Sequence, residues 1–144
     1  MSKKVIITQS ENIAPCQVLA EKITILADHS QTASYEVFIH DAHKDAGPPP
    51  HHHPWDESFF IIDGEIEFDC DGATSTVTRG GFVHIPAGTV HSFRYATPTA
   101  KILGITSNNG AADFFSDLDK ECGDSPEMEK VLDVVARHDV TLIS

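Results

Sequence analysis

The stretch GPPPHHHPWDESFFIIDG, from Gly47 to Gly64, places three consecutive histidines between prolines and ahead of a short apolar run. Residues two apart on an extended chain face the same way, so His51 and His53 can point to one side while His52 points to the other. Glu57 opens the apolar run. The triplet lies mid-chain between predicted strands, which makes a purification-tag remnant a poor interpretation. A solvated loop and part of a metal site both remain open.

A third histidine, far along the chain, bears on this choice. His91 opens the segment HSFRY and shares its face with Phe93 and Tyr95. Two histidines at i and i+2, a carboxylate soon after them and a histidine on a distant strand can form a site of three nitrogens and one oxygen inside a barrel. Imidazole and carboxylate ligands suit one divalent transition-metal ion, namely Fe, Ni, Mn, Cu or Zn.

Alternation of apolar and polar residues dominates the middle of the chain. It predicts short strands rich in β-branched and aromatic residues at residues 22–26, 34–40, 58–62, 65–68, 74–77, 82–86, 91–95 and 101–106. Gly, Pro and Asp separate these segments, which is typical of a β-sandwich or barrel. The dipeptide Asp63-Gly64 stands between two apolar runs and predicts a two-residue hairpin turn.

The C-terminal part of the chain has helical periodicity instead. In its first segment, which Asn108 or Asn109 can cap, the apolar residues at helical spacing are Ala111, Phe114, Phe115 and Leu118. In the second segment, Ser125 suits the N-cap and Pro126 the first helical position. The expected apolar face of this second helix is Met128, Val131, Leu132 and Val135. We expect both helices to pack against the outside of the β-domain.

Length and composition narrow the class of protein. The 144 residues fit one domain, with a core barrel at about residues 18–106 and a helical segment at about 110–138. The net charge of −12 argues against nucleic acid or an anionic membrane as a partner. The cysteines, Cys16, Cys70 and Cys122, are widely spaced, which favours reduced thiols. Since no apolar run approaches the ~20 residues that span a bilayer and no signal peptide is recognisable, we expect a cytoplasmic protein.

Two separated patterns resemble the two motifs of the cupins, namely His51-x-His53-x3-Glu57-x6-Gly64 and Gly80-x5-Pro86-x-Gly88-x2-His91. The resemblance implies an all-β fold, a double-stranded β-helix (cupin or jelly-roll barrel), with the C-terminal α-helices packed outside. It also separates the members of the triplet, because a frame that starts at His52 would put Pro54 in a ligand position. The chain departs from the family pattern at Tyr95, where Asn is common, and this departure affects the strand turn or the pocket wall.

The likeness extends to small single-domain cupins related to quercetin 2,3-dioxygenase and covers roughly residues 34–138, including PPPHHHPWDESFFIIDGEIEF, GGFVHIPAGTVHSFRY and DFFSDL. It implies oxidative ring cleavage of a flavonol, in which the metal binds a deprotonated substrate hydroxyl and dioxygen adds. It further implies Glu57 as the catalytic base and, as the metal ligands, His51, His53, Glu57 and His91.

Three classes of function follow from these observations. The first is a metal-dependent dioxygenase acting on a phenolic, flavonol-like or enolisable small molecule. The second is a metal-dependent isomerase, decarboxylase or hydrolase of a polar metabolite, which needs cationic side chains in its pocket. The site segments offer only Arg79 and Arg94, and Arg94 is predicted to point outward. The third is a non-catalytic module that binds a small molecule or a metal.

Several side chains near the motifs have two interpretations. Trp55 lies between the ligand candidates and suits either the pocket mouth or an interface. The apolar candidates for a substrate pocket, which suit the barrel core equally well, are Phe59, Ile61, Phe82, Phe93 and Tyr95.

The histidines outside the motifs are not expected to be ligands. His84 alternates with Val83 and Ile85 and is predicted to face away from them. The histidines without any motif are expected to be exposed, namely His29, His40, His43 and His138.

The strand of Glu57 also has an apolar outer face. Phe60 and Ile62 point away from the metal side, so either the terminal helices or a second subunit must cover them. We expect a homodimer.

Overall fold

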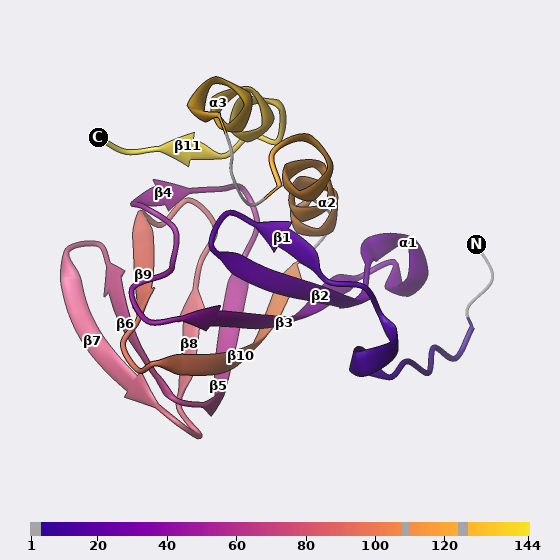
Figure 1. Ribbon diagram of the computed structural model, residues 1–144, viewed down its shortest axis with the longest axis horizontal. Helices are drawn as coiled ribbons and strands as arrows, with labels where there is room; N and C mark the ends of the chain where they lie inside the picture. The colour runs from indigo at the N-terminus through magenta and orange to yellow at the C-terminus, as the bar shows by residue number, and fades with distance from the viewer. Residues whose placement is uncertain (1–3, 108–109, 124–126) are drawn as a thin grey trace.

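Two antiparallel β-sheets pack face to face in the computed structural model, which describes residues 4–107, 110–123 and 127–144 (Figure 1). One sheet has the strand order β1-β2-β3-β10-β5-β8 and the other β11-β4-β9-β6-β7. The strands are β1 Cys16–Val18, β2 Glu21–Ala27, β3 Tyr35–His43, β4 His51–His52, β5 Glu57–Asp63, β6 Glu65–Cys70, β7 Ala73–Thr78, β8 Phe82–Ile85, β9 His91–Tyr95, β10 Thr99–Ser107 and β11 Thr141–Leu142. The helices are η1 Ser10–Asn12, a 3-10 turn, and α1 His29–Thr32, α2 Ala111–Glu121 and α3 Met128–Arg137.

The alternation of apolar and polar residues correctly predicts where strands form. Each of the eight predicted strands overlaps an observed one, and the all-β jelly-roll fold with C-terminal helices is confirmed. The inward residues of both sheets form the core between them, and its fully buried members include Phe59, Ile61, Ile66, Phe68 and Ile102. Burial of these apolar side chains stabilises the packed sheets by roughly 1.5–3 kcal/mol each.

The predicted hairpin at Asp63-Gly64 is wrong. β5 and β6 follow each other in sequence, yet they lie in different sheets, so this turn carries the chain from one sheet to the other. Gly64 has φ +82, and a Cβ atom there would lie 2.6 Å from the Cβ of Ala100. A two-residue hairpin turn lies instead at Asp71-Gly72, with φ 52 and 81, between the paired ends of β6 and β7. Positive φ at both positions is what a type I′ turn requires.

The two C-terminal helices close one end of the sheets. α2 packs against β1, and α3 lies beside α2 and β11 (Figure 1). On α2, the predicted face is buried, with Ala111, Phe115 and Leu118 in a cluster that includes Phe38 and Trp55. The predicted caps Asn108, Asn109 and Ser125, and Pro126 with them, lie outside the described residues.

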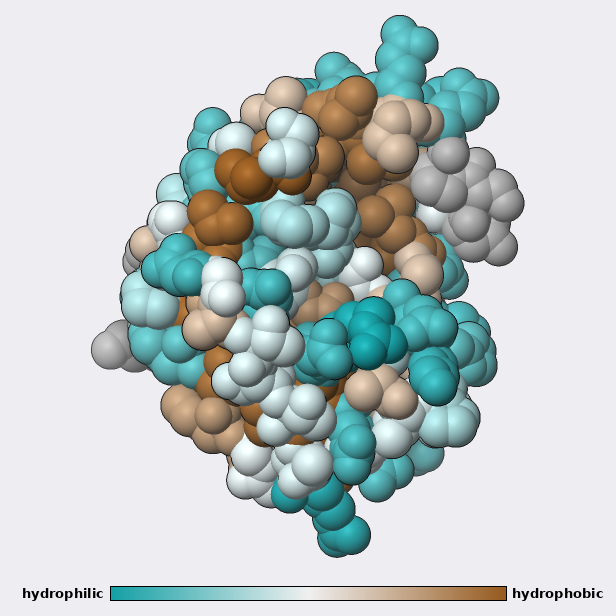
Figure 2. Space-filling view, turned by 90° about the vertical axis from the view of Figure 1, so that its left-hand side faces the viewer, coloured by the Kyte–Doolittle hydropathy of each residue, from teal (hydrophilic) through white to brown (hydrophobic). Residues whose placement is uncertain are grey.

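The predicted apolar face of α3 is partly wrong. Val131 and Val135 are buried as expected, and Val134 joins them. Met128 and Leu132 are 66% and 48% exposed, because the buried stripe of the helix passes through Val134. Figure 2 shows apolar surface gathered at the end of the molecule where α3 and β11 lie in Figure 1, with a mixture of hydrophilic and apolar surface below it.

Two expectations from composition also have a structural counterpart. The three cysteines are free thiols. Within residues 4–107, 110–123 and 127–144, no helix is long and apolar enough to cross a membrane.

Gly64, where the chain crosses from one sheet to the other, can be compared with Gly72 in the β6–β7 hairpin turn. We expect Gly72→Ala to lower the free energy of unfolding by about 1–2 kcal/mol, because Ala is strained at positive φ but meets open space there. We expect Gly64→Ala to cost roughly 1–3 kcal/mol more, since the added methyl also collides with Ala100. Urea unfolding measures both values, and equal losses would contradict tight packing at the crossing.

Candidate metal centre

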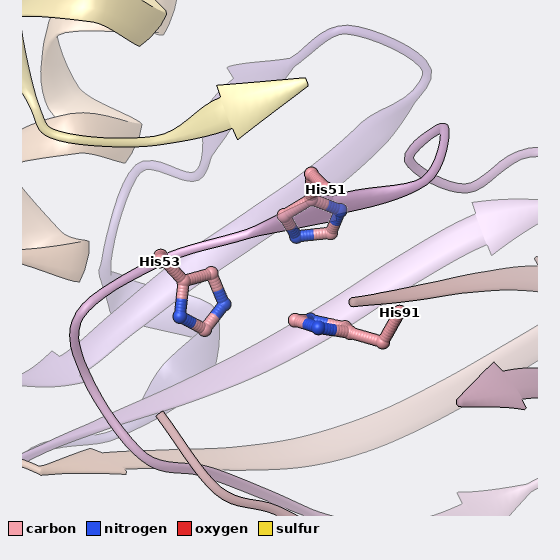
Figure 3. Close-up of side chains that lie close together, drawn as sticks. All are labelled: His51, His53 and His91. Carbon is pink, nitrogen blue, oxygen red and sulfur yellow. The ribbon is translucent and has the colours of Figure 1, made fainter. Parts of the chain in front are cut away.

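Strand pairing brings the first two histidines of the cluster together. β4 pairs with β9 so that His51 stands directly opposite His91, and their ring centroids are 4.2 Å apart. His53, two residues further on, faces the same side as His51, and Figure 3 shows the three rings turned toward one another. His52 alternates with them and so points to the other face of the sheet, and it is half-buried. Its strand partner on β11 is Thr141.

Glu57 reaches the cluster from the opposite sheet. Its Oε1 atom lies 3.4 Å from Nε2 of His53 and 3.4 Å from Nε2 of His91. The loops that carry the two sequence motifs are tied together, because Gly88 N–H donates to the His53 carbonyl at 2.9 Å. Ala87 N–H likewise donates to the Asp56 carboxylate at 2.9 Å. These bonds fix the distance between the motifs.

Each histidine is held by the ring nitrogen that faces away from the cluster. Because a carbonyl oxygen can only accept, Nδ1 must carry the hydrogen in each ring, and Nε2 keeps a free lone pair. One ligand nitrogen from each ring lies within 4.8 Å of the others, and Nε2 of His91 is buried without a hydrogen-bond partner among the described residues. The three Nδ1 bonds run from His51 to Pro49 O (2.8 Å), from His53 to Trp55 O (3.0 Å) and from His91 to Thr89 O (2.8 Å).

The electrostatics of Glu57 and His51 favour the forms that bind a cation. Burial alone would raise the pKa of Glu57, but the neighbouring His53 and His91 outweigh burial and hold this pKa far below its usual range. Burial, followed by the neighbouring His91, lowers the pKa of His51 to about 4. Burial would lower the pKa of His91 as well, but the nearby Glu57 carboxylate and the hydrogen bond to the Thr89 carbonyl raise it. A carboxylate beside a neutral imidazole matches what a metal ion requires.

A cavity of about 270 Å³ adjoins the cluster. His51, His53 and Glu57 line one part of it, and α2, α3 and the β1–β2 hairpin supply apolar walls that include Val18, Ile23, Phe115, Leu118, Val131 and Val135. None of the lining residues in the described part of the chain is Lys or Arg.

Trp55 belongs to this cavity rather than to an interface. It is 4% exposed, and its ring stacks on His53 at a centroid distance of 4.4 Å and an angle of 10°. Its carbonyl accepts the Nδ1–H of the same histidine. Trp55 therefore holds His53 in two ways.

The predicted pocket residues separate into three groups. Phe93 lines the cavity, whereas Phe59, Ile61 and Tyr95 lie in the core between the sheets and are not among its lining residues. Phe82 is a correction, because it stands opposite Phe60 on the outer face of the sheet and is 64% exposed.

Two predictions about polar side chains outside the cluster agree with the structure. His84 is exposed and shares a 2.8 Å hydrogen bond with Ser58, apart from the metal candidates. Arg94 points outward to Asp45 and Glu67.

His40 is a further correction and reveals a residue that sequence reasoning missed. It is only 2% exposed, since it lies two residues from Phe38 on β3 and both face inward. Its Nδ1 lies 3.2 Å from Oε2 of Glu21, and both residues line the cavity. The missed signal was its shared face with Phe38, and for Glu21 the shared face with Ile23.

Comparisons with known proteins agree with this architecture. A family model described as a cupin domain matches residues 38–104. Quercetin 2,3-dioxygenase of Bacillus subtilis (strain 168) is 28% identical over 95 residues, which cover 65% of this chain and 28% of that enzyme. The chain spans about half or less of the length of the curated relatives it matches.

Solved structures share the fold at low sequence identity. An RmlC-like cupin from Shewanella frigidimarina matches with a TM-score of 0.66 and 16% identity, over 75% of this chain and 95% of that one. A predicted oxalate decarboxylase from Thermotoga maritima matches with a TM-score of 0.64 and 16% identity, over 72% of this chain and 99% of that one. Both motifs on paired strands, the family model over residues 38–104 and the shared jelly roll support the assignment of this chain to the cupin superfamily.

Proposed function

We propose that this cupin holds one divalent transition-metal ion through His51, His53, Glu57 and His91 and acts as a dioxygenase on a phenolic, flavonol-like or enolisable small molecule. The observation that carries the metal proposal is the set of three Nδ1–carbonyl bonds, which leave the Nε2 lone pairs free in a cluster whose ligand atoms lie within 4.8 Å of one another. Metal-binding histidines nearly always donate their other ring N–H in this way. Glu57 adds an oxygen ligand that belongs to Fe, Ni, Mn, Cu and Zn sites alike.

The chemistry divides between the ion and the chain. A bound divalent ion supplies a Lewis acid that lowers the pKa of a substrate hydroxyl and brings substrate and dioxygen together. Glu57 is then the candidate to take the hydroxyl proton, because it lines the cavity and is the only carboxylate among the four proposed ligands. Dioxygen is the oxidant and both of its atoms enter the product, so no external reductant is needed.

The cavity walls favour an apolar aromatic substrate. Its described lining residues are mostly aliphatic and aromatic, and no Lys or Arg among them can neutralise an anionic group. That composition weakens the alternative of an isomerase, decarboxylase or hydrolase acting on an anionic metabolite. The similarity to quercetin 2,3-dioxygenase supports the same direction. A module that binds such a molecule without transforming it is the remaining alternative.

Oxygen uptake distinguishes these functions. We expect the metal-loaded protein to consume one dioxygen per substrate with at least one member of a panel of flavonols and simpler phenols, and a chelator to abolish uptake. Glu57→Gln should lower turnover by roughly 100-fold or more, because the proton acceptor is lost, whereas His84→Gln, on an exposed histidine, serves as the unchanged control. Turnover under argon, or tight binding without uptake across the panel, would refute the dioxygenase.

A homodimer is also proposed, through the outer face of the β10-β5-β8 part of the sheet. The terminal helices do not cover this face, since they pack against β1 and β11. Leu103, Phe60 and Phe82 stand side by side across the three strands. Phe60 is 43% exposed and Phe82 is 64% exposed, and burying such side chains against a second copy removes apolar surface from water.

Light scattering after gel filtration tests the dimer. We expect a dimeric mass for the wild type and a shift toward the monomer in Phe82→Ser, because the more exposed of the two phenylalanines on the apolar face is lost. Leu132→Ser is the matched control, since Leu132 is a comparably exposed apolar residue on α3. A monomeric wild type, or equal masses for the two variants, would rule out this interface.

A further inference from the structure

A carboxylate stands in the otherwise apolar cavity, apart from the candidate metal ligands. Glu21 is 6% exposed and lines the cavity together with His40. The Tyr95 hydroxyl donates to its Oε2 atom at 2.7 Å, and His40 Nδ1 lies 3.2 Å from the same oxygen. Tyr95 is fully buried and His40 is nearly so. The carboxylate is therefore held in place by two side chains from β3 and β9.

One oxygen of this carboxylate has no protein partner in the described part of the chain. Both hydrogen bonds go to Oε2, and Oε1 is neither bonded nor among the fully enclosed polar atoms. Since Glu21 lines the cavity, Oε1 is open to that space. Burial and the neighbouring Glu21 raise the pKa of Tyr95 far above its usual value, so the phenol keeps its proton and remains a donor. A buried carboxylate oxygen without a donor is costly, and a ligand hydroxyl can supply one.

The carboxylate and the metal candidates occupy different depths of the barrel. His91 and Tyr95 both face inward on β9 and are four residues apart, so their Cα atoms are separated by roughly 13 Å along the strand. The same cavity is lined by His51 and Glu57 and by Glu21. One elongated molecule can therefore meet both polar groups.

We propose that Glu21, positioned by Tyr95 and His40, is a second binding point that accepts a hydrogen bond from a ligand hydroxyl, and that the cavity takes an elongated, uncharged aromatic molecule with a hydroxyl at each end. The hydroxyl at one end of the ligand rests on the proposed function, in which a substrate hydroxyl binds the metal. The hydroxyl at the other end is inferred from Glu21 alone. Hydrogen bonds to charged groups discriminate strongly against a ligand that lacks the donor.

The size of the cavity agrees with such a ligand. A dry cavity of about 150 Å³ accommodates one benzene ring. The volume of about 270 Å³ found in this chain thus suits about two rings. The chain's one tryptophan, Trp55, lines the cavity, so its fluorescence reports whether a molecule has entered.

A matched pair of ligands tests the proposal on the zinc-loaded wild type. Biphenyl-4,4′-diol has a hydroxyl at both ends, and 4′-fluorobiphenyl-4-ol has nearly the same shape but only one donor. We expect calorimetry to give a roughly 10- to 100-fold lower Kd for the diol, with Trp55 fluorescence changing for both. Equal Kd values for the two ligands in the wild type would overturn the proposal without any variant.

Variants then test whether Glu21 is the group that accepts the hydrogen bond from the second hydroxyl of the diol. Glu21→Gln should reduce the preference for the diol to about threefold or less, since the charged acceptor is gone, and should leave zinc content unchanged. Glu36→Gln is the control, because Glu36 is an equally buried carboxylate whose two oxygens already accept from His29 N–H and Ala112 N–H, both at 3.0 Å. A preference that survives in Glu21→Gln, or that falls equally in Glu36→Gln, would refute the assignment.

These outcomes are separable from failure of the proposed function. A diol preference that depends on Glu21 but is accompanied by no oxygen uptake would leave the binding point intact and remove the dioxygenase. Repeating the titration on metal-free protein separates the two ends, because Glu21 should still favour the diol when the metal contributes nothing.

Discussion

The pairing of the two-residue strand β4 with β9 is the interaction on which the candidate metal centre depends. It sets His51 opposite His91, and β11 holds β4 from its other side through Leu142 and the 2.9 Å bond from Ile143 N–H to the Pro50 carbonyl. Because side chains alternate along a strand, a slip of one residue would turn His52 inward and both of its neighbours outward. The C-terminal strand therefore supports a site whose ligands lie far from it in sequence.

The rest of the site is organised around that register. Backbone carbonyls orient the three imidazoles, and Trp55 both stacks on His53 and accepts its N–H. The C-terminal helices enclose the space beside them with apolar side chains, so the polar groups that remain in the cavity interact strongly with whatever enters. Glu57 and Glu21 are two such groups at different depths of the barrel. Each is in contact with neighbouring side chains, and each still lines the cavity.

Sequence periodicity predicts the main strands because each of them buries one face. It misses β1, β4 and β11, since two or three residues are too few to show alternation. Two of these, β4 and β11, are the strands that align His51. The dipeptide Asp63-Gly64 has the chemistry of a hairpin turn, but the position of Ala100 and the separation of the sheets decide its role. A local turn sequence predicts the backbone conformation of the turn, but it does not predict which strands pair with each other.

The candidate metal ligands can be predicted from the sequence, because the two motifs must converge in this fold. The second binding point, Glu21, cannot be predicted in this way. Glu21 and Tyr95 are separated by 74 positions and meet only through tertiary packing. Tyr95 occupies a position where the family commonly has Asn, which marks it as unusual without naming its partner. Phe82 shows the opposite error, since an aromatic residue inside a motif faces outward when its strand pairs with Phe60.

Metal content is the most direct test of the central claim, that two members of the histidine triplet act with His91 and Glu57 as one ligand set. Protein purified without chelator or metal-affinity capture would be measured by elemental analysis, for the wild type and for His51→Ala, His91→Ala and His52→Ala. The account predicts close to one equivalent of metal in the wild type and in His52→Ala, and a loss of roughly tenfold or more in the other two. Metal retained in His51→Ala and His91→Ala, or lost equally in His52→Ala, would contradict it.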